Sequence, residues 1–210
     1  RNGVGVDNID LDACKDLGIA VLNVPAYCVQ DVADHALTLS LAVCRRLQQT
    51  IDFVRGGGWG EAPILPARRL DQLVYGVVGL GRIGRASAVR AKPFYQKVIG
   101  YDAFMPNANV PEVDEVKGSF EELLGEADII TLHVPGTADT KQMMNAERFA
   151  QMRPGAVFIN TARGGIVDEE ALLAALENGH LAGAGLDVTN PEPPHMDNPL
   201  VHRNDVVITP

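Results

Sequence analysis

The sequence predicts an α/β protein with a doubly wound parallel sheet. Three observations point to this fold class. A glycine-rich turn, G-L-G-R-I-G, follows the apolar run that begins at Leu73. Beyond it, short apolar runs alternate regularly with helix-compatible segments, and polar residues follow the runs directly. Strands that alternate with helices form a parallel sheet covered by helices on both faces, with ligands at the carboxyl ends of the strands.

The expected elements follow in order along the chain. After the strand that begins at Leu73, the sequence predicts strands over Val98–Tyr101, Ile129–Val134, Ala156–Asn160, Ala182–Val188 and Val206–Thr209. The intervening helices are predicted over Arg82–Ala91, Ser119–Leu124, Ala146–Met152 and Glu169–Glu177. Six strands with their helices make up the predicted sheet.

The first 28 residues are expected to form a separate unit. Val4–Val6 and Ile19–Val24 are apolar runs typical of strands, and between them Asp10 can cap a helix that ends at Gly18. These elements make a βαβ unit without a sheet of its own. Because Arg1 is not Met and a strand is expected so near the start, we expect a piece of a longer protein.

One long helix is predicted from Val29 to Val54. Apolar residues recur there at spacings of three and four on more than one face, which favours burial against both the domain and a second subunit. A simple core helix is an equally good interpretation. The segment Gly56–Pro66 has no periodicity and is predicted to be a loop that links this helix to the first strand.

The glycine-rich turn has the G-x-G-x-x-G spacing of a dinucleotide pocket. Gly79 would allow a sharp turn, Gly81 would let the backbone approach a pyrophosphate, and Gly84 would let the helix pack closely on the strand. The spacing alone is weak, and a glycine turn in an unrelated α/β protein stays open. Asp102, 18 residues after Gly84, ends the next apolar run, where its carboxylate can bind the ribose hydroxyls of NAD and repel the phosphate of NADP.

Composition excludes several function classes. With 18 Lys and Arg against 27 Asp and Glu, the net charge of −9 argues against a nucleic-acid surface. Cys14, Cys28 and Cys44 have no metal-site or disulfide spacing, so no metal is predicted and a reducing cytoplasm fits best. No apolar run is long enough for a membrane span, and no signal-peptide core is present.

Two charged residues near the predicted strand ends suggest chemistry. Arg163 is followed by two glycines, and its guanidinium can bind a carboxylate in bidentate fashion, although pairing with a structural acid such as Asp168 stays open. Glu192 lies between prolines and can orient an imidazole and raise its pKa, or can be a solvated loop acid. No histidine is obviously paired with Glu192.

Four motifs carry a resemblance that covers essentially the whole chain. They are G-V-G-V-D-N-I-D at Gly3–Asp10, G-L-G-R-I-G at Gly79–Gly84, N-T-A-R-G-G-I-V-D-E at Asn160–Glu169 and L-D-V-T-N-P-E-P at Leu186–Pro193. The sequence resembles the D-isomer-specific 2-hydroxyacid dehydrogenases, including phosphoglycerate, glyoxylate/hydroxypyruvate and D-lactate dehydrogenases, and the C-terminal-binding-protein corepressors. The resemblance implies a Rossmann-type NAD-binding domain over 29–210, with 1–28 as the remnant of a flavodoxin-like substrate domain.

The resemblance also implies roles for residues. Arg163 matches the substrate-binding arginine and Glu192 the partner of the catalytic histidine, while Val4 and Gly5 match a backbone clamp for the substrate carboxylate. The implied cofactor is NAD, and the implied NAD-binding residues are Gly79, Gly81, Arg82, Ile83 and Gly84 at the pyrophosphate, Asp102 at the ribose, Val134, Pro135 and Thr140 near the adenosine, and Thr161, Ala162, Arg163 and Asp187 near the nicotinamide.

The implied reaction interconverts a D-2-hydroxy acid and a 2-oxo acid by hydride transfer. The family's acid/base histidine follows a strand that ends T-P, so we expect it directly after Thr209–Pro210, and we expect this chain alone to be inactive. The long helix matches one that relatives use to form a homodimer. Two alternatives stay open: a corepressor-like protein that senses NAD(H), and a domain that binds another nucleotide.

Overall fold

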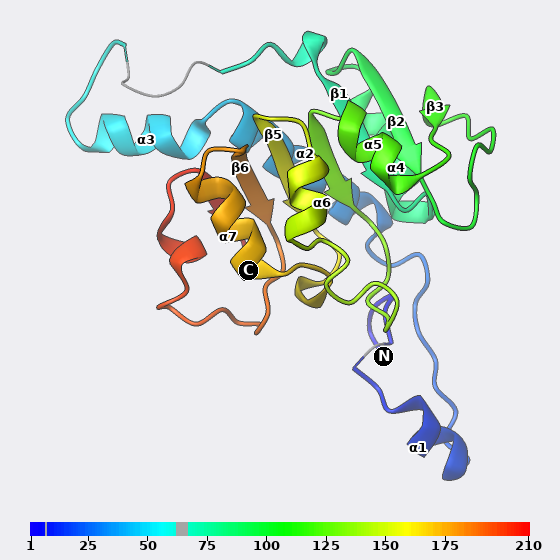
Figure 1. Ribbon diagram of the computed structural model, residues 1–210. Coiled ribbons are helices and arrows are strands. Elements are labelled where there is room, and N and C mark those ends of the chain that lie inside the picture. Colours follow the sequence, from blue (N-terminus) through cyan, green and yellow to red (C-terminus); the bar gives the residue numbers. More distant parts are fainter. Residues whose placement is uncertain (7, 62–66) are drawn as a thin grey trace.

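The computed structural model describes residues 1–6, 8–61 and 67–210. Its centre is a sheet of seven parallel strands in the order β3-β2-β1-β4-β5-β6-β7 (Figure 1). The strands are β1 (Val74–Val78), β2 (Lys97–Tyr101), β3 (Glu115–Val116), β4 (Ile129–Leu132), β5 (Ala156–Asn160), β6 (Leu181–Leu186) and β7 (Val206–Ile208). The doubly wound α/β fold predicted from the sequence is confirmed.

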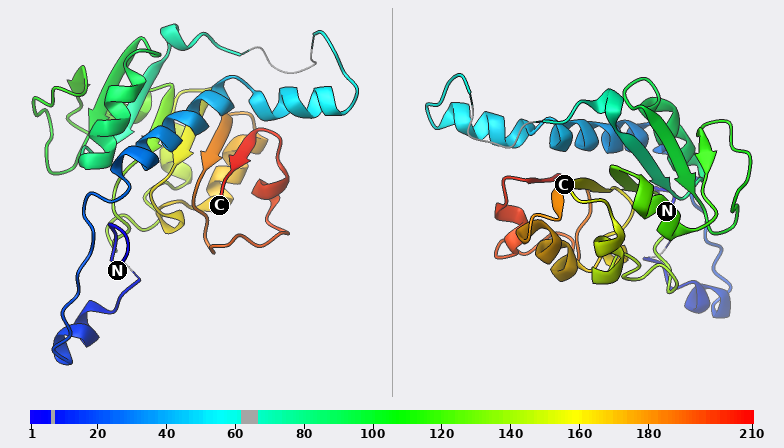
Figure 2. Two further views of the ribbon diagram at one scale, coloured as in Figure 1. Left: turned by 180° about the vertical axis from the view of Figure 1, so that it is seen from behind. Right: turned by 45° about the horizontal axis from the view of Figure 1, so that its top comes forward.

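The core lies on both faces of this sheet, because β1, β4 and β5 are buried almost throughout. One face is covered by α2 (Val29–Cys44) and α4 (Arg82–Ala91), which pack in one apolar cluster. The other is covered by α5 (Phe120–Glu126), α6 (Ala146–Gln151) and α7 (Glu169–Glu177). Figure 2 shows α2 running across the back of the sheet.

The described part of the chain contains four further short helical segments. They are α1 (Leu11–Asp16), η1 (Leu70–Gln72), η2 (Gly164–Ile166) and η3 (Pro199–His202). None of the described helices is long and apolar enough to cross a lipid bilayer.

The prediction of one continuous helix over 29–54 is wrong. The structure has two helices, α2 and α3 (Leu47–Arg55), separated at Arg45 and Arg46. Arg46 adopts a left-handed backbone with φ of 55°, and its guanidinium donates a hydrogen bond to the carbonyl oxygen of Ala182 in β6. The contact fixes the end of α2 on the sheet. Beyond it, α3 has no buried residue and projects from the body (Figure 1).

The prediction of six strands is also corrected, because β3 forms a seventh at the edge of the sheet. This strand has only two residues, and ion pairs accompany its backbone pairing with β2. Lys97 and Lys117 each contact the carboxylates of Glu115 and Glu126, and all four N–O distances lie between 2.5 and 2.8 Å. A two-residue strand has no periodicity that a sequence pattern could reveal.

The N-terminal βαβ unit is only partly present. The structure contains α1, capped by the Asp10 side chain as predicted, but no strand over 4–6 or 19–24. Single hydrogen bonds join these two segments, from the Val24 amide to the Gly3 carbonyl and from the Asn23 side chain to the Val4 carbonyl. Strands need a neighbouring ladder to satisfy their backbone groups, and this segment has no sheet to join.

Of the loop predicted over Gly56–Pro66, residues 56–61 form turns and bends, and 62–66 lie outside the described residues.

Candidate functional site

The glycine-rich segment forms the predicted strand, turn and helix between β1 and α4. Gly79 has φ of +93°, a conformation that suits glycine. A Cβ atom on Gly84 would lie 1.9 Å from the Gly79 carbonyl oxygen, so only glycine allows α4 to approach β1 so closely. A Cβ on Gly81 would meet no atom within 4 Å. Gly79 and Gly84 therefore shape the turn, while the backbone at Gly81 faces open space.

The amino end of α4 lies directly behind this open space. Arg82 and Ile83 occupy its first turn, and no side chain caps the helix at Gly81. The first amide groups of a helix have no partner within the helix and carry partial positive charge. This end of α4 can therefore bind an anionic group such as a pyrophosphate.

Asp102 follows β2 and is fixed against the same turn. Its Oδ2 accepts a hydrogen bond from the Leu80 amide at 2.9 Å, and its Oδ1 accepts one from the Phe104 amide at 2.9 Å. Each carboxylate oxygen has two acceptor sites, so both remain able to accept from a further donor. The two parts of the predicted dinucleotide pocket are thus in direct contact, with the carboxylate available to hydroxyl groups.

The loops after neighbouring strands pack against one another along this carboxyl edge. A Cβ on Gly79 would lie 2.8 Å from the His133 carbonyl oxygen, one on Gly136 would lie 3.0 Å from the Arg163 side chain, and one on Gly164 would lie 2.0 Å from the Thr189 carbonyl oxygen. Side chains at these glycines would force the loops apart. The ends of β1, β4, β5 and β6 therefore form one continuous surface.

The loop after β4 contains Val134, Pro135 and Thr140. The Thr140 hydroxyl donates to the Pro135 carbonyl oxygen at 2.6 Å and closes the loop. At its start, burial lowers the pKa of His133 to about 4, and its Nε2 lies 3.1 Å from the hydroxyl oxygen of Thr131. His133 is therefore neutral near pH 7 and is unsuited to donate a proton there.

Arg163 lies in the loop after β5, and Asn160 holds this loop in place. The Asn160 side chain accepts from the Ala162 amide and donates to the Arg163 carbonyl oxygen, at 3.0 and 2.9 Å. The Arg163 guanidinium donates to the Ala162 carbonyl oxygen. Beside it, the hydroxyl oxygen of Thr161 is buried and has no hydrogen-bond partner. A buried hydroxyl without a partner is costly, so a ligand with a polar group fits this position.

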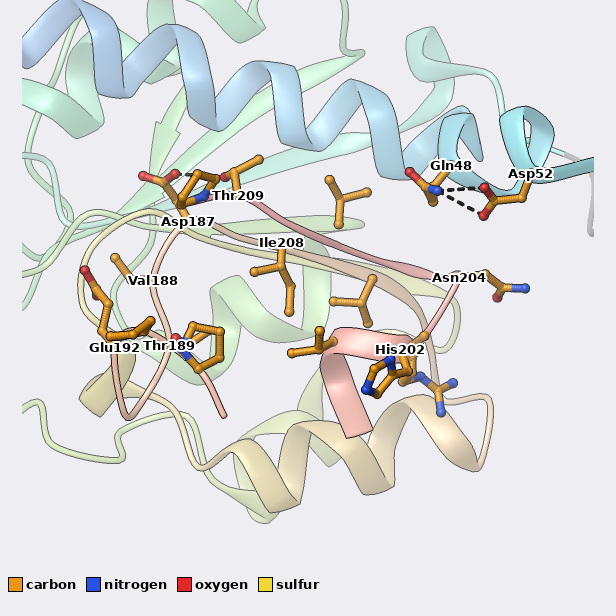
Figure 3. Close-up of a pocket in the computed structure, with 17 residues that line it drawn as sticks. Gln48, Asp52, Asp187, Val188, Thr189, Glu192, His202, Asn204, Ile208 and Thr209 are labelled. Carbon is orange, nitrogen blue, oxygen red and sulfur yellow. Dashed lines mark hydrogen bonds between the residues drawn. The ribbon is translucent and has the colours of Figure 1, made fainter. Parts of the chain in front are cut away.

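Glu192 is exposed on the next loop, which Glu169 fixes in place. The Glu169 carboxylate accepts from the Asn190 amide at 2.7 Å and from the Asn198 side chain at 2.8 Å. Glu192 lines a cavity of about 810 Å³ together with Asp187 and residues of β7 (Figure 3). This cavity extends along the edge strand β7, from Gln48, Asp52 and Asn204 at one end to Asp187 and Glu192 at the carboxyl edge.

No hydrogen bond or ion pair joins a histidine to Glu192 within the described ranges. The other histidines with ring hydrogen bonds have partners elsewhere: His35 contacts the Thr209 hydroxyl, His180 the Met152 carbonyl oxygen and His202 that of Met196. Figure 3 shows Glu192 and His202 on opposite sides of the cavity.

Asp187 follows β6, and sequence reasoning missed its partners. Its Oδ1 accepts from the Thr209 hydroxyl at 2.8 Å and lies 3.1 Å from Nε2 of His35, in α2. No local signal connects His35 with residues more than 150 positions away. Thr161 and Asn160 belong to a motif that was recognised, but their hydrogen bonding follows only from the folded loop.

Val4 and Gly5 belong to the N-terminal segment, and the start of the chain, marked N, lies below the sheet in Figure 1. The Val4 carbonyl oxygen accepts from the Asn23 side chain at 2.8 Å. Their part in holding a substrate stays a prediction.

Comparison with known proteins decides the family. Residues 37–210 match the family described as D-isomer specific 2-hydroxyacid dehydrogenase, NAD binding domain. The chain belongs to this family. The resemblance stated from the four motifs is confirmed, and so are the NAD-binding domain and its Rossmann-type fold.

Individual 2-hydroxyacid dehydrogenases agree with this assignment. D-3-phosphoglycerate dehydrogenase of Archaeoglobus fulgidus is 40% identical over 210 residues, which are 100% of this chain and 40% of that protein. Hydroxypyruvate reductase of Thermotoga maritima is 39% identical over 212 residues, 100% of this chain and 68% of that protein. The crystal structure of D-lactate dehydrogenase from Aquifex aeolicus complexed with NAD and lactic acid superimposes with a TM-score of 0.86 at 36% identity, covering 99% of this chain and 66% of that one.

Proposed function

We propose that this chain supplies the nucleotide-binding part of an NAD-dependent dehydrogenase that interconverts D-2-hydroxy acids and 2-oxo acids. The observation that carries the proposal is the continuous carboxyl edge, on which a hydrogen bond from the Leu80 amide holds the Asp102 carboxylate and close contacts at glycines join the Arg163 and Glu192 loops. Family membership supports the reaction class. Because the chain spans only 40% of the phosphoglycerate dehydrogenase it matches, the activity of the whole protein is part of this proposal.

The residues along the edge fit NAD. Gly79, Gly81, Arg82, Ile83 and Gly84 would hold the pyrophosphate, since Gly81 faces open space before the first turn of α4. Asp102 would bind the ribose hydroxyls, and Val134, Pro135 and Thr140 would line the adenosine side. Thr161, Ala162, Arg163 and Asp187 would line the nicotinamide side, where the Thr161 hydroxyl lacks a partner. When bound, NAD supplies the hydride acceptor or donor at its nicotinamide C4.

Arg163 has the chemistry to bind the substrate. A guanidinium presents a planar pair of N–H donors that matches a carboxylate, and the same charge can polarise an adjacent keto group. The backbone amides of Val4 and Gly5 would bind the carboxylate from the opposite side. A small 2-oxo acid, held in this way, has its C2 atom fixed in position for the transfer.

Glu192 would act on a histidine rather than on the substrate. A carboxylate next to an imidazole stabilises the protonated ring and raises its pKa, which makes it a general acid near neutral pH. No histidine of the described residues occupies this place, and we propose that the one implied by the family resemblance follows Pro210. The chain of 210 residues alone would then bind NAD and turn over negligibly.

We also propose a homodimer in the cytoplasm. The described helix α3 has no buried residue, and its Leu47 and Val54 side chains are 50% and 46% exposed. An amphipathic helix stable only through packing needs a surface to cover its apolar face. The three cysteines are free thiols, as a reducing compartment requires.

Turnover by the full-length protein tests the function. NADH oxidation would be followed with glyoxylate, hydroxypyruvate and pyruvate, for the wild type, Arg163→Lys and Glu192→Gln. We expect turnover with at least one acid, a raised KM in Arg163→Lys and an altered pH profile of kcat in Glu192→Gln. NAD binding without turnover of any 2-oxo acid would contradict the enzyme and favour the corepressor-like alternative.

A further inference from the structure

His35 of α2 contacts two residues at the carboxyl ends of different strands. Its Nε2 lies 2.8 Å from the Thr209 hydroxyl oxygen, directly after β7, and 3.1 Å from Oδ1 of Asp187, directly after β6. The Thr209 hydroxyl also lies 2.8 Å from Asp187 Oδ1. The three side chains form a closed triangle. Asp187 also lines the cavity that contains Glu192, so the triangle links α2 to the candidate site.

The hydrogens in this triangle can be assigned by counting donors. Thr209 has one hydroxyl hydrogen, and an ionised Asp187 can only accept, so Thr209 donates to Asp187. Toward His35 the Thr209 oxygen must then accept, which places a hydrogen on Nε2 of His35. Protonation of His35 consequently takes place at Nδ1. It adds a positive charge beside Asp187 without breaking any of the three contacts.

We propose that His35 is a specificity-determining residue, whose charge sets the preference of the site for NAD⁺ over NADH through Asp187. This rests on the proposed function, which puts Asp187 on the nicotinamide side. The ring of NAD⁺ carries a positive charge and that of NADH none. An uncompensated Asp187 carboxylate therefore favours NAD⁺, and a protonated His35 cancels part of that advantage.

The other charged groups near His35 are either paired with other residues or exposed to solvent. The elements packed on α2 are α3, α4, β5, β6 and β7. Asp34 of α2 pairs with Arg90 of α4, and Asp52 of α3 accepts from Gln48. Asp31 is exposed one turn before His35. Asp187 is thus the charged side chain in contact with His35 in the described structure.

Binding of both nucleotides at two pH values tests this inference. Dissociation constants of NAD⁺ and NADH would be measured by calorimetry at pH 8.5 and 5.5, for the wild type, His35→Gln and the control His195→Gln on an exposed loop. Glutamine keeps an uncharged donor for Thr209. In the wild type and the control, the dissociation constant of NAD⁺ divided by that of NADH should be about three- to tenfold higher at pH 5.5 than at pH 8.5. In His35→Gln the rise should be smaller than in the control by about that factor, which isolates the part due to His35.

The outcomes separate this inference from the proposed function. A wild type that binds neither nucleotide contradicts the function. Binding of both, with the same pH dependence in His35→Gln as in the wild type or with none in the wild type, overturns the role of His35 alone. If His35→Gln does not fold, Asp187→Asn replaces it: removal of that charge must reduce the rise in the ratio in the same way, and a rise as large as in the wild type overturns the inference.

Discussion

The Cβ position of Gly84 lies 1.9 Å from the carbonyl oxygen of Gly79, whereas that of Gly81 meets no atom within 4 Å. Two glycines of one motif therefore have different physical roles. At Gly84 the absent side chain permits a backbone contact inside the fold. At Gly81 it leaves space outside the fold, in front of the first turn of α4.

Alanine substitutions at these two positions should separate folding from binding. In Gly84→Ala the methyl group meets backbone that cannot move freely, so we expect the free energy of unfolding to fall by about 2–3 kcal/mol or more. In Gly81→Ala the fold should stay within about 1 kcal/mol of the wild type, while NAD affinity falls at least about tenfold. Urea unfolding and calorimetric titration measure the two quantities. Normal NAD affinity in Gly81→Ala would contradict the binding mode.

Asp102→Ala should weaken NAD binding. The substitution removes the acceptor for the ribose hydroxyls and also the fixed partner of the Leu80 amide, so we expect an affinity loss of about ten- to a hundredfold. Discrimination against NADP should fall as well, because the carboxylate that repels the extra phosphate is gone. Titration with both nucleotides checks this, with Asp71→Ala, an exposed carboxylate paired to Arg69, as the matched control. Unchanged NAD affinity would reject the ribose assignment.

Asp128→Ala should destabilise the fold without a direct effect on the site. Asp128 is 2% exposed, accepts from the Val74 amide at 2.9 Å, and pairs with Arg68 and Arg153. Loss of the buried carboxylate leaves the Val74 amide without its acceptor, while Arg68 and Arg153 remain partly solvated, so we expect a cost of about 1–3 kcal/mol. Chemical unfolding measures the change. A loss below about 1 kcal/mol, similar to that of Asp71→Ala, would show that the ion pairs contribute little.

Stability should fall with acid in a window set by His133. Its pKa is lowered from 6.5 to about 4 in the fold, so the unfolded chain binds the proton more readily between these values. The stabilisation is complete above pH 6.5 and is lost as the pH falls toward 4. Melting temperatures at pH 7.5 and 5 should differ more in the wild type than in His133→Gln. Equal differences in melting temperature in the two proteins would show that the sensitivity to acid comes from groups other than His133.

A second group, Glu115, affects stability at lower pH than His133. The Lys117 and Lys97 ammonium groups lower the pKa of Glu115 from 4.5 to about 2. The stabilisation by ionised Glu115 is present above pH 4.5 and is lost below it. This loss weakens the attachment of β3 to β2. Glu115 stays ionised between pH 7.5 and 5. The difference in melting temperature over this range therefore reflects histidine.

The sequence predicted most of the fold because regular alternation of strands and helices is a local pattern. Because parallel strands run in the same direction, the residues that follow them could be placed at one edge of the sheet from the sequence. These residues are Gly79, Asp102, Arg163 and Asp187. The break at Arg46 could not be predicted, because the apolar spacing continues through Leu47. What ends α2 there is a hydrogen bond to Ala182, far away in the sequence.

The unpredicted parts of the candidate site also depend on distant contacts. The His35–Thr209–Asp187 triangle joins three elements, and the unpaired Thr161 hydroxyl appears only once its loop is folded. The structure lacks the strands predicted at 4–6 and 19–24, and here the reason is that distant packing contacts are absent. Their apolar residues suit a sheet, yet Ile19 and Leu22 are 55% and 78% exposed, so local propensity has no packing to support it.

Hydrogen–deuterium exchange with and without NAD tests the central claim most directly. The account predicts slower exchange at amides of residues 79–84, 102–104 and 161–163 on addition of NAD, with little change around Asp128 at the opposite edge of the sheet. Protection confined to other segments, or absent at saturating NAD, would contradict the placement of the nucleotide along the carboxyl ends of β1, β2 and β5.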